Sequence, residues 1–105
     1  MITEEEAERA VDYLRDSARS AAQARANKEY VTGFQKVLKA QIMRENPSDA
    51  IGTQEAKAYS DPRYLTHLEA IKAAVEADAH AMFLRDAAQA RIDAWRTQSS
   101  NLRAG

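Results

Sequence analysis

The sequence predicts an all-α fold, and two observations carry that prediction. The stretch from Asp61 to Ser100 contains neither glycine nor proline after Pro62, so nothing in it breaks a helix. Alanine, the strongest helix former, accounts for 22 of the 105 residues. We expect two long helices, over residues 3–45 and 62–100, joined by a loop of roughly 15 residues over 46–61, with a frayed C-terminus over 101–105.

The first predicted helix begins at a capping box, in which Thr3 is followed three positions later by Glu6. Apolar residues then recur at steps of three and four, but the stripe slips near Asn27, where the helix could also break. Gly33 lowers the helix propensity by about 1 kcal/mol relative to alanine and favours a kink. One continuous helix to about Arg44 is the expectation.

The pair Asn46-Pro47 ends this helix, because the residue before a proline avoids the α region. The predicted loop contains a helix-compatible piece that could form one or two turns from an N-cap at Thr53. The second long helix starts at Asp61 as N-cap, with Pro62 in the first helical position. An antiparallel helical hairpin is the expected topology, and exchange of helices between subunits is the alternative.

Along the second helix, apolar residues recur at helical spacing on one side, which predicts a packing face. Because alanine supplies so much of the hydrophobic content, few side chains are large enough to build a core within one hairpin. We therefore expect the hairpin to assemble into an oligomeric bundle, a homo-oligomer with coiled-coil packing. The predicted stripe is Leu65, Leu68, Ile71, Val75, Ala79, Met82 or Phe83, Ala87, Ala90 and Ala94, and the predicted oligomer interface is Leu68, Ile71, Val75, Met82 and Phe83.

Composition narrows the class of protein. The chain has no cysteine and a net charge of −1, and its length fits a single domain over residues 1–105. The acidic N-terminus resembles neither a signal nor a transit peptide, and no apolar run reaches the roughly 18 residues that a membrane span needs. A cytoplasmic protein without membrane contact is expected.

No catalytic constellation appears in the sequence. His67 and His80 lie too far apart on one helix to share a metal ion, and Glu76 with His80 supplies only two ligands. The three glycines are scattered, so no phosphate-binding loop is formed. We expect no enzymatic activity, no metal site and no cofactor.

Two basic segments are candidates for nucleic-acid binding. In the first helix they are Arg25, Lys28, Lys36, Lys39 and Arg44, and near the C-terminus Trp95 lies between Arg91 and Arg96. An indole among arginines can stack on a base while the guanidinium groups bind phosphates. The structural alternative is that Trp95 closes the end of a hydrophobic interface and that the basic residues face solvent or pair with acidic residues of a neighbouring subunit.

The segment QKVLKAQIMRENPSD at residues 35–49, together with the later ARIDAW and the terminal Ala-Gly, resembles small bacteriophage helical proteins and, more distantly, the UvsY family of phage recombination mediators. The resemblance implies an oligomeric ring in a bacterial host cell that holds single-stranded DNA and helps a recombinase to replace single-strand-binding protein. By position, it gives the DNA contact to Lys36, Lys39 and Arg44.

Two functions follow as hypotheses. The first is a self-associating accessory protein of phage-type DNA recombination, which binds single-stranded DNA, recombination proteins or single-strand-binding protein. The second is a helical adaptor or structural oligomer that acts only through protein-protein contacts.

Overall fold

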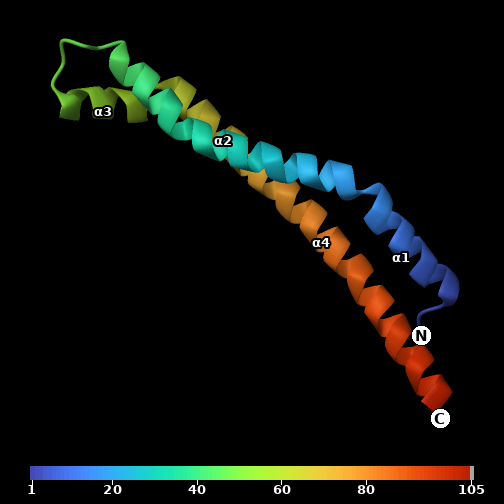
Figure 1. The fold of residues 1–105 in the computed structure, drawn as a ribbon. Coiled ribbons are helices and arrows are strands. Elements are labelled where there is room, and N and C mark those ends of the chain that lie inside the picture. The colour runs from blue at the N-terminus through green and yellow to red at the C-terminus, as the bar shows by residue number, and fades with distance from the viewer. Residues whose placement is uncertain (105) are drawn as a thin grey trace. The chain divides into compact units, whose positions relative to one another are not determined.

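The computed structural model describes residues 1–104 and contains, over that range, four α-helices and no strand: α1 (Glu4–Asp16), α2 (Ala18–Arg44), α3 (Ile51–Ser60) and α4 (Pro62–Ala104) (Figure 1). The prediction of an all-α fold is therefore confirmed. The chain divides into two compact units, which we describe separately. Unit 1 combines Met1–Gln23 with the chain from Asp78 onward, and unit 2 is Ala24–Ala77. The single domain over 1–105 stays a prediction.

Helix α1 begins where the capping box predicts. Thr3 is extended (φ −82°, ψ 159°), and its hydroxyl accepts a 3.1 Å hydrogen bond from the backbone N–H of Glu6. Glu4, Glu5 and Glu6 fill the first turn, where negative charge interacts favourably with the helix dipole.

The predicted continuous helix over 3–45 is interrupted at Ser17, and not near Asn27 or Gly33. An α-helix leaves its last carbonyl groups without intrahelical donors. Here the Ser17 N–H donates to Tyr13 O, while the Arg85 guanidinium of α4 donates to Leu14 O at 2.8 Å. The same Arg85 nitrogen donates to the Ser17 hydroxyl at 2.8 Å. A side chain inserted into the backbone ladder is a known cause of a helix break, and it accounts for the difference.

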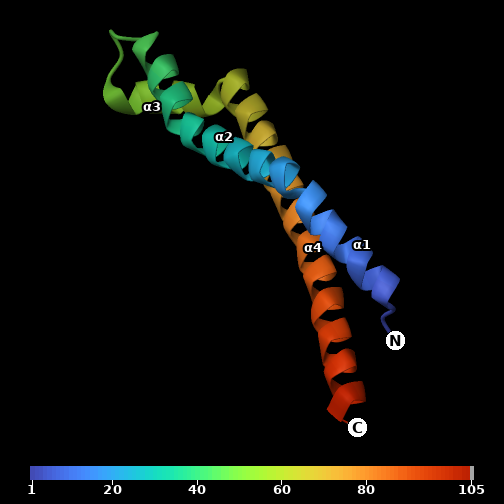
Figure 2. The ribbon, with the colours of Figure 1, turned by 45° about the vertical axis from the view of Figure 1, so that its right-hand side comes forward.

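In unit 1, α1 and the C-terminal part of α4 run antiparallel, and the ribbons lie beside each other in Figures 1 and 2. The Gln98 side chain accepts from Ile2 N and donates to Ile2 O, both at 2.9 Å. Between this pair and the Arg85 contact, the core consists of Ala10, Ala88 and Ile92, with Leu14 packed against them. Alanines at these positions let the two helices approach closely.

In unit 2, α2 packs antiparallel to the start of α4. His67 Nε2 lies 2.6 Å from Val31 O, and one turn further the Gln35 amide donates to the Tyr64 hydroxyl at 2.8 Å. Ile42 is the largest fully buried side chain among the described residues. Polar hydrogen bonds of this kind fix the register of two helices more than they add stability.

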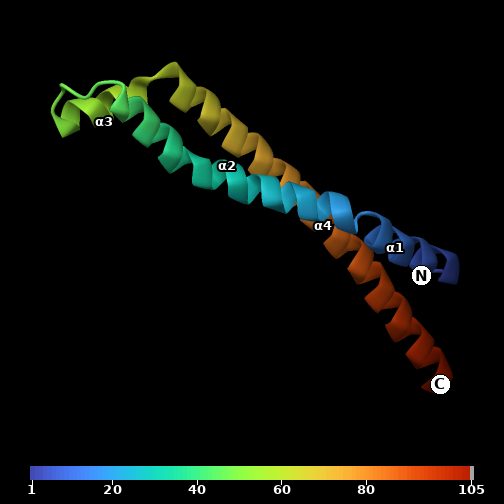
Figure 3. The same ribbon diagram turned by 45° about the horizontal axis from the view of Figure 1, so that its top comes forward.

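The stretch predicted as a loop over 46–61 contains the ten-residue helix α3, which returns beside the last turns of α2 (Figure 3). Its N-cap is Ala50, without a side-chain hydrogen bond, and not Thr53 as predicted. The Gln54 amide instead holds the turn by donating to Asn46 O and Asp49 O, both at 3.0 Å. Ala58 is completely buried, which fixes α3 against the rest of unit 2.

Helix α4 begins as predicted and ends later. Asp61 is extended, and its carboxylate accepts a 2.8 Å hydrogen bond from the backbone N–H of Arg63. The helix continues to Ala104, through residues predicted to fray, while Gly105 lies outside the described residues.

The buried faces of the helices repeat in alternate steps of three and four residues, the 3.5-residue period of a left-handed coiled coil. Residues of reduced exposure that follow this period include, in unit 2, Val31, Gln35, Leu38 and Ile42 on α2 with Tyr64, His67, Ile71 and Ala74 on α4. In unit 1 they include Ala7, Ala10 and Leu14 on α1 with Arg85, Ala88, Ile92 and Trp95 on α4. Of the predicted α4 stripe, Ile71 belongs to this seam, whereas Leu65, Leu68, Val75, Met82 and Phe83 lie on exposed sides of the helix.

Candidate interaction surfaces

The α4 portion of unit 2 exposes a row of large apolar side chains. Leu65 is 62% exposed, Leu68 40% and Val75 46%. Their spacing of three and seven residues keeps them on one side of the helix, one residue further along the chain than the seam positions Tyr64, His67 and Ala74. We call Leu65, Leu68 and Val75 the α4 face. It is a helix surface with the composition of a packing interface, and residues 1–104 leave it partly open to solvent.

Unit 1 also exposes predicted interface residues. Phe83 is 64% exposed and Met82 39% exposed, and the predicted stripe continues over the exposed Ala87, Ala90 and Ala94. The structure thus places Leu68, Val75, Met82 and Phe83 where another molecule can reach them, and Ile71 in the seam.

Lys39, one of the predicted DNA contacts, is used inside unit 2. Its ammonium group donates to the Tyr59 hydroxyl at 2.8 Å, lies 4.7 Å from the centre of that ring and is 3.7 Å from Glu55. The hydrogen bond to Tyr59 raises the pKa of Lys39 above its usual value. Tyr59 also meets Tyr64 edge to face at 5.3 Å. Lys39 therefore joins α2 to α3, a role that sequence spacing alone does not reveal.

The other basic candidates of α2 do not form one continuous surface. Lys36 is exposed, and no ion pair or hydrogen bond of its side chain is found among residues 1–104. Arg25 is exposed and Lys28 half-buried, and both side chains have partners. Helical spacing places Arg25, Lys28, Lys36 and Lys39 toward one side and Arg44 on another.

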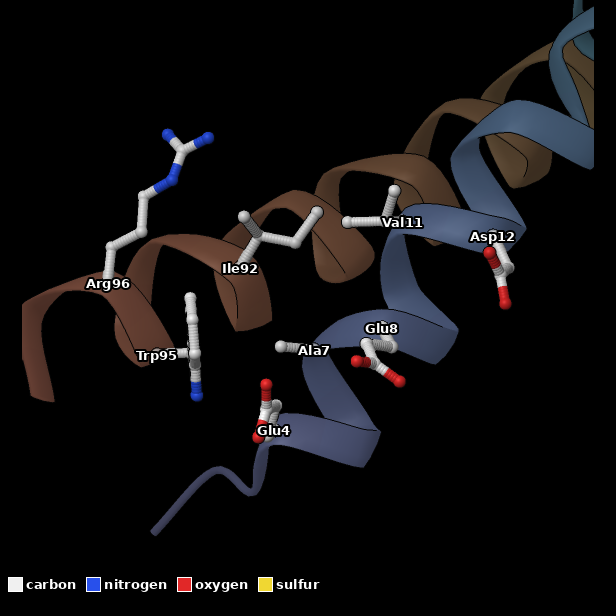
Figure 4. A pocket seen from close by; sticks show the side chains of 8 residues that line it. All are labelled: Glu4, Ala7, Glu8, Val11, Asp12, Ile92, Trp95 and Arg96. Carbon is white, nitrogen blue, oxygen red and sulfur yellow. The ribbon is translucent and has the colours of Figure 1, made fainter. Parts of the chain in front are cut away.

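Trp95 lines a groove in unit 1 with a volume of about 380 Å³ (Figure 4). Ala7, Val11 and Ile92 supply apolar walls, and Trp95 stands beside Ala7 and Glu4. The indole is half-buried at the end of the seam. This position agrees with the structural alternative, in which the tryptophan closes a hydrophobic interface.

The charged rim of this groove is mainly acidic. Glu4, Glu8 and Asp12 line it from α1, whereas Arg96 points away from α1 in Figure 4, and Arg91 is exposed. None of these three acidic residues was among the site residues predicted from the sequence. Their spacing of four residues is the signal that places them along one edge.

An ion cluster holds the start of α4 to the end of α2 in unit 2. The Arg63 guanidinium donates to both oxygens of Glu45, at 2.8 and 2.6 Å, and to both oxygens of Asp61, at 3.0 and 2.9 Å. These hydrogen bonds lower the pKa of Glu45 and of Asp61 and raise the pKa of Arg63. The forked geometry matches the strongest type of charged hydrogen bond, and it serves the fold.

Within residues 1–104, no three histidine or carboxylate side chains gather in a way that could hold a metal ion. Over the same residues, no helix is both long enough and apolar enough to cross a membrane. No known protein family, characterised protein or solved structure matches the chain.

Proposed function

We propose that this protein is a self-associating helical accessory protein that works without catalysis, by binding other proteins along its helices. The observation that carries the proposal is the α4 face. Three large apolar side chains on one helix side, each at least 40% exposed, leave enough apolar surface for a helical partner. Another copy of this chain or a second helical protein fits that surface.

The test is a charge on the α4 face. Val75→Asp places a carboxylate among apolar partner atoms, so association should weaken by several kcal/mol. Ala73→Asp adds the same charge two residues away, on another exposed side of the helix, and should leave association unchanged. Sedimentation at matched concentrations measures both variants. Equal behaviour of Val75→Asp and the wild type would refute the proposed surface.

A second candidate function is single-stranded DNA binding in phage-type recombination. The free ammonium group of Lys36 and the exposed guanidinium of Arg44, together with the resemblance to recombination mediators, favour it. Binding through phosphates should weaken steeply with salt, and the double variant Lys36→Gln with Arg44→Gln should lower affinity on every sequence and reduce the salt dependence. Fluorescence anisotropy with a labelled oligonucleotide decides the matter, and an absence of binding at low salt would exclude this function.

A further inference from the structure

The outer side of α2 carries a second row of apolar and small residues in unit 2. Tyr30 is 70% exposed and Val37 47% exposed, and Gly33 lies between them. Alanines at both ends continue the alternation of three- and four-residue steps that the buried seam shows. We call this set the α2 outer face, and its members are Ala26, Tyr30, Gly33, Val37 and Ala40.

Within residues 1–104, no contact or backbone conformation explains why position 33 is a glycine. It lies inside α2, where glycine is a poor helix former, and none of the described residues shows a positive φ that only glycine would favour. A Cβ added to Gly33 would meet nothing within 4 Å. A missing side chain is useful on an exposed helix side where another backbone approaches closely, and the part of the chain that the structure describes supplies no such backbone at Gly33.

We propose that a second copy of this chain packs antiparallel on the α2 outer face, with a two-fold axis at Gly33. In that arrangement Gly33 faces its own copy, and Tyr30 faces Val37 of the second copy. Ala26 likewise faces Ala40. The row is therefore complementary to itself, as a two-fold symmetric interface requires. The proposal rests on the proposed function, since it names one surface through which self-association occurs.

The charged residues beside the α2 outer face are consistent with the same two-fold axis. Glu29 and Lys36 lie on one flank of the α2 outer face, seven residues apart, and neither side chain has an ion pair or hydrogen bond among residues 1–104. An antiparallel pairing through Gly33 brings Glu29 of each copy opposite Lys36 of the other, which gives two opposite-charge pairs. Flanking charges of this kind set partner choice and orientation in helix pairs. A parallel pairing would instead turn this flank toward the opposite flank of the second copy, at Asn27, Phe34 and Gln41, and would form neither pair.

The Tyr30 side chain is held in place by its neighbours, which suits it to anchor the proposed interface. Its ring stacks on Phe34 at 6.2 Å with an interplanar angle of 16°, and Phe34 in turn lies 5.6 Å from the His67 ring. A tyrosine supported from behind loses little side-chain entropy on binding, which is typical of residues that dominate interfaces.

Charge reversal and its rescue test the proposal with the full-length chain. Lys36→Glu alone, or Glu29→Lys alone, turns both symmetry-related pairs into like-charge pairs, so the dissociation constant should rise about tenfold in sedimentation equilibrium. The double variant Glu29→Lys with Lys36→Glu restores opposite charges and should return the dissociation constant to the wild-type value. Loss without rescue, or no loss at all, would overturn the two-fold arrangement.

Gly33→Glu supplies an independent test, since it adds helix propensity and places a charge where the two copies would meet. Helix content by circular dichroism should be kept while association is lost. Gly52→Glu is the matched control: it makes the same change in α3, where an added Cβ also meets nothing within 4 Å, and it should associate like the wild type. The pattern separates this inference from the proposed function. Normal association of Gly33→Glu with weakened Val75→Asp would refute only the α2 contact, and the reverse pattern would refute only the α4 face.

Discussion

At the scale of single residues, Arg85 shows how one side chain can determine a helix boundary. Its guanidinium reaches from α4 to Leu14 O and to the Ser17 hydroxyl, both at 2.8 Å. Serine readily offers a local hydrogen-bonding alternative to the helical ladder, and the Ser20 hydroxyl also donates to Ser17 O at 3.1 Å. The junction therefore has charge-assisted hydrogen bonds from a half-buried arginine where a continuous helix would need none.

Replacing Arg85 by methionine should destabilise unit 1 by about 1–3 kcal/mol, because the Leu14 carbonyl loses a charged donor in a partly buried place. Urea unfolding followed by circular dichroism measures the change. Arg91→Met is the matched control, since Arg91 is exposed on the same helix and should cost no more than about 0.5 kcal/mol. Equal stability of the two variants would show that Arg85 is incidental to the junction.

The starts of α1 and α4 were predicted correctly because their caps are local. Thr3 with Glu6, and Asp61 with Pro62, lie within a few residues of the groups they satisfy. The break at Ser17 depends on Arg85, whose position 68 residues away no local pattern reveals. The same reason explains Lys39, which the sequence offers as a free charge and the structure uses to bind Tyr59 across 20 positions.

At the scale of elements, the hydrophobic pattern of α4 does not identify the seam, because polar residues occupy some of the seam positions. His67 and Arg85 occupy seam positions, while Leu65, Leu68 and Val75 lie one position further along the chain. A periodicity analysis selects the side richest in large apolar residues. On this helix that side is the exposed one, so the pattern locates the apolar side of α4 correctly but does not locate the seam, to which only Ile71 of the predicted interface residues belongs.

The start of α4 should be sensitive to acid. Hydrogen bonds from Arg63 lower the pKa of Glu45 and Asp61 in the folded chain. A carboxylate with a lowered folded pKa contributes stability that is present above its unfolded pKa of about 4 and is lost as the pH falls through the folded value. The free energy of unfolding should therefore decrease below about pH 4 through this cluster.

Arg63→Gln isolates the contribution of the cluster. Other carboxylates titrate over the same range, so the quantity to measure is the difference in free energy of unfolding between the wild type and Arg63→Gln. That difference should be largest at neutral pH and should shrink as the pH is lowered, because the wild type loses charged pairs that the variant never had. A difference that stays constant with pH would mean that Arg63 acts only by packing.

At the scale of the whole molecule, the buried interior is built mostly of small residues. Ala7, Ala10, Ala58, Ala74 and Ala88 are five of the seven buried hydrophobic residues among those described, and Ile42 and Ile92 are the others. Full burial of a large apolar side chain contributes roughly 1.5–3 kcal/mol, and a side chain that stays partly exposed forgoes part of that free energy. The α4 face and the α2 outer face hold five such side chains, Leu65, Leu68, Val75, Tyr30 and Val37. Association is the means by which this surface can add to stability.

Thermal stability should accordingly depend on protein concentration. For a dimer that unfolds as it dissociates, a hundredfold rise in concentration adds about 2.7 kcal/mol, which should raise the Tm by about 5–10 °C. The shift can be measured by circular dichroism in thermal melts at about 2 µM and about 200 µM protein. Val75→Asp and Gly33→Glu should each reduce the concentration dependence, since each removes one contact. A wild-type Tm that is equal at both concentrations, with a cooperative transition, would show that the alanine-rich interior is sufficient by itself and that the exposed faces do not stabilise the fold.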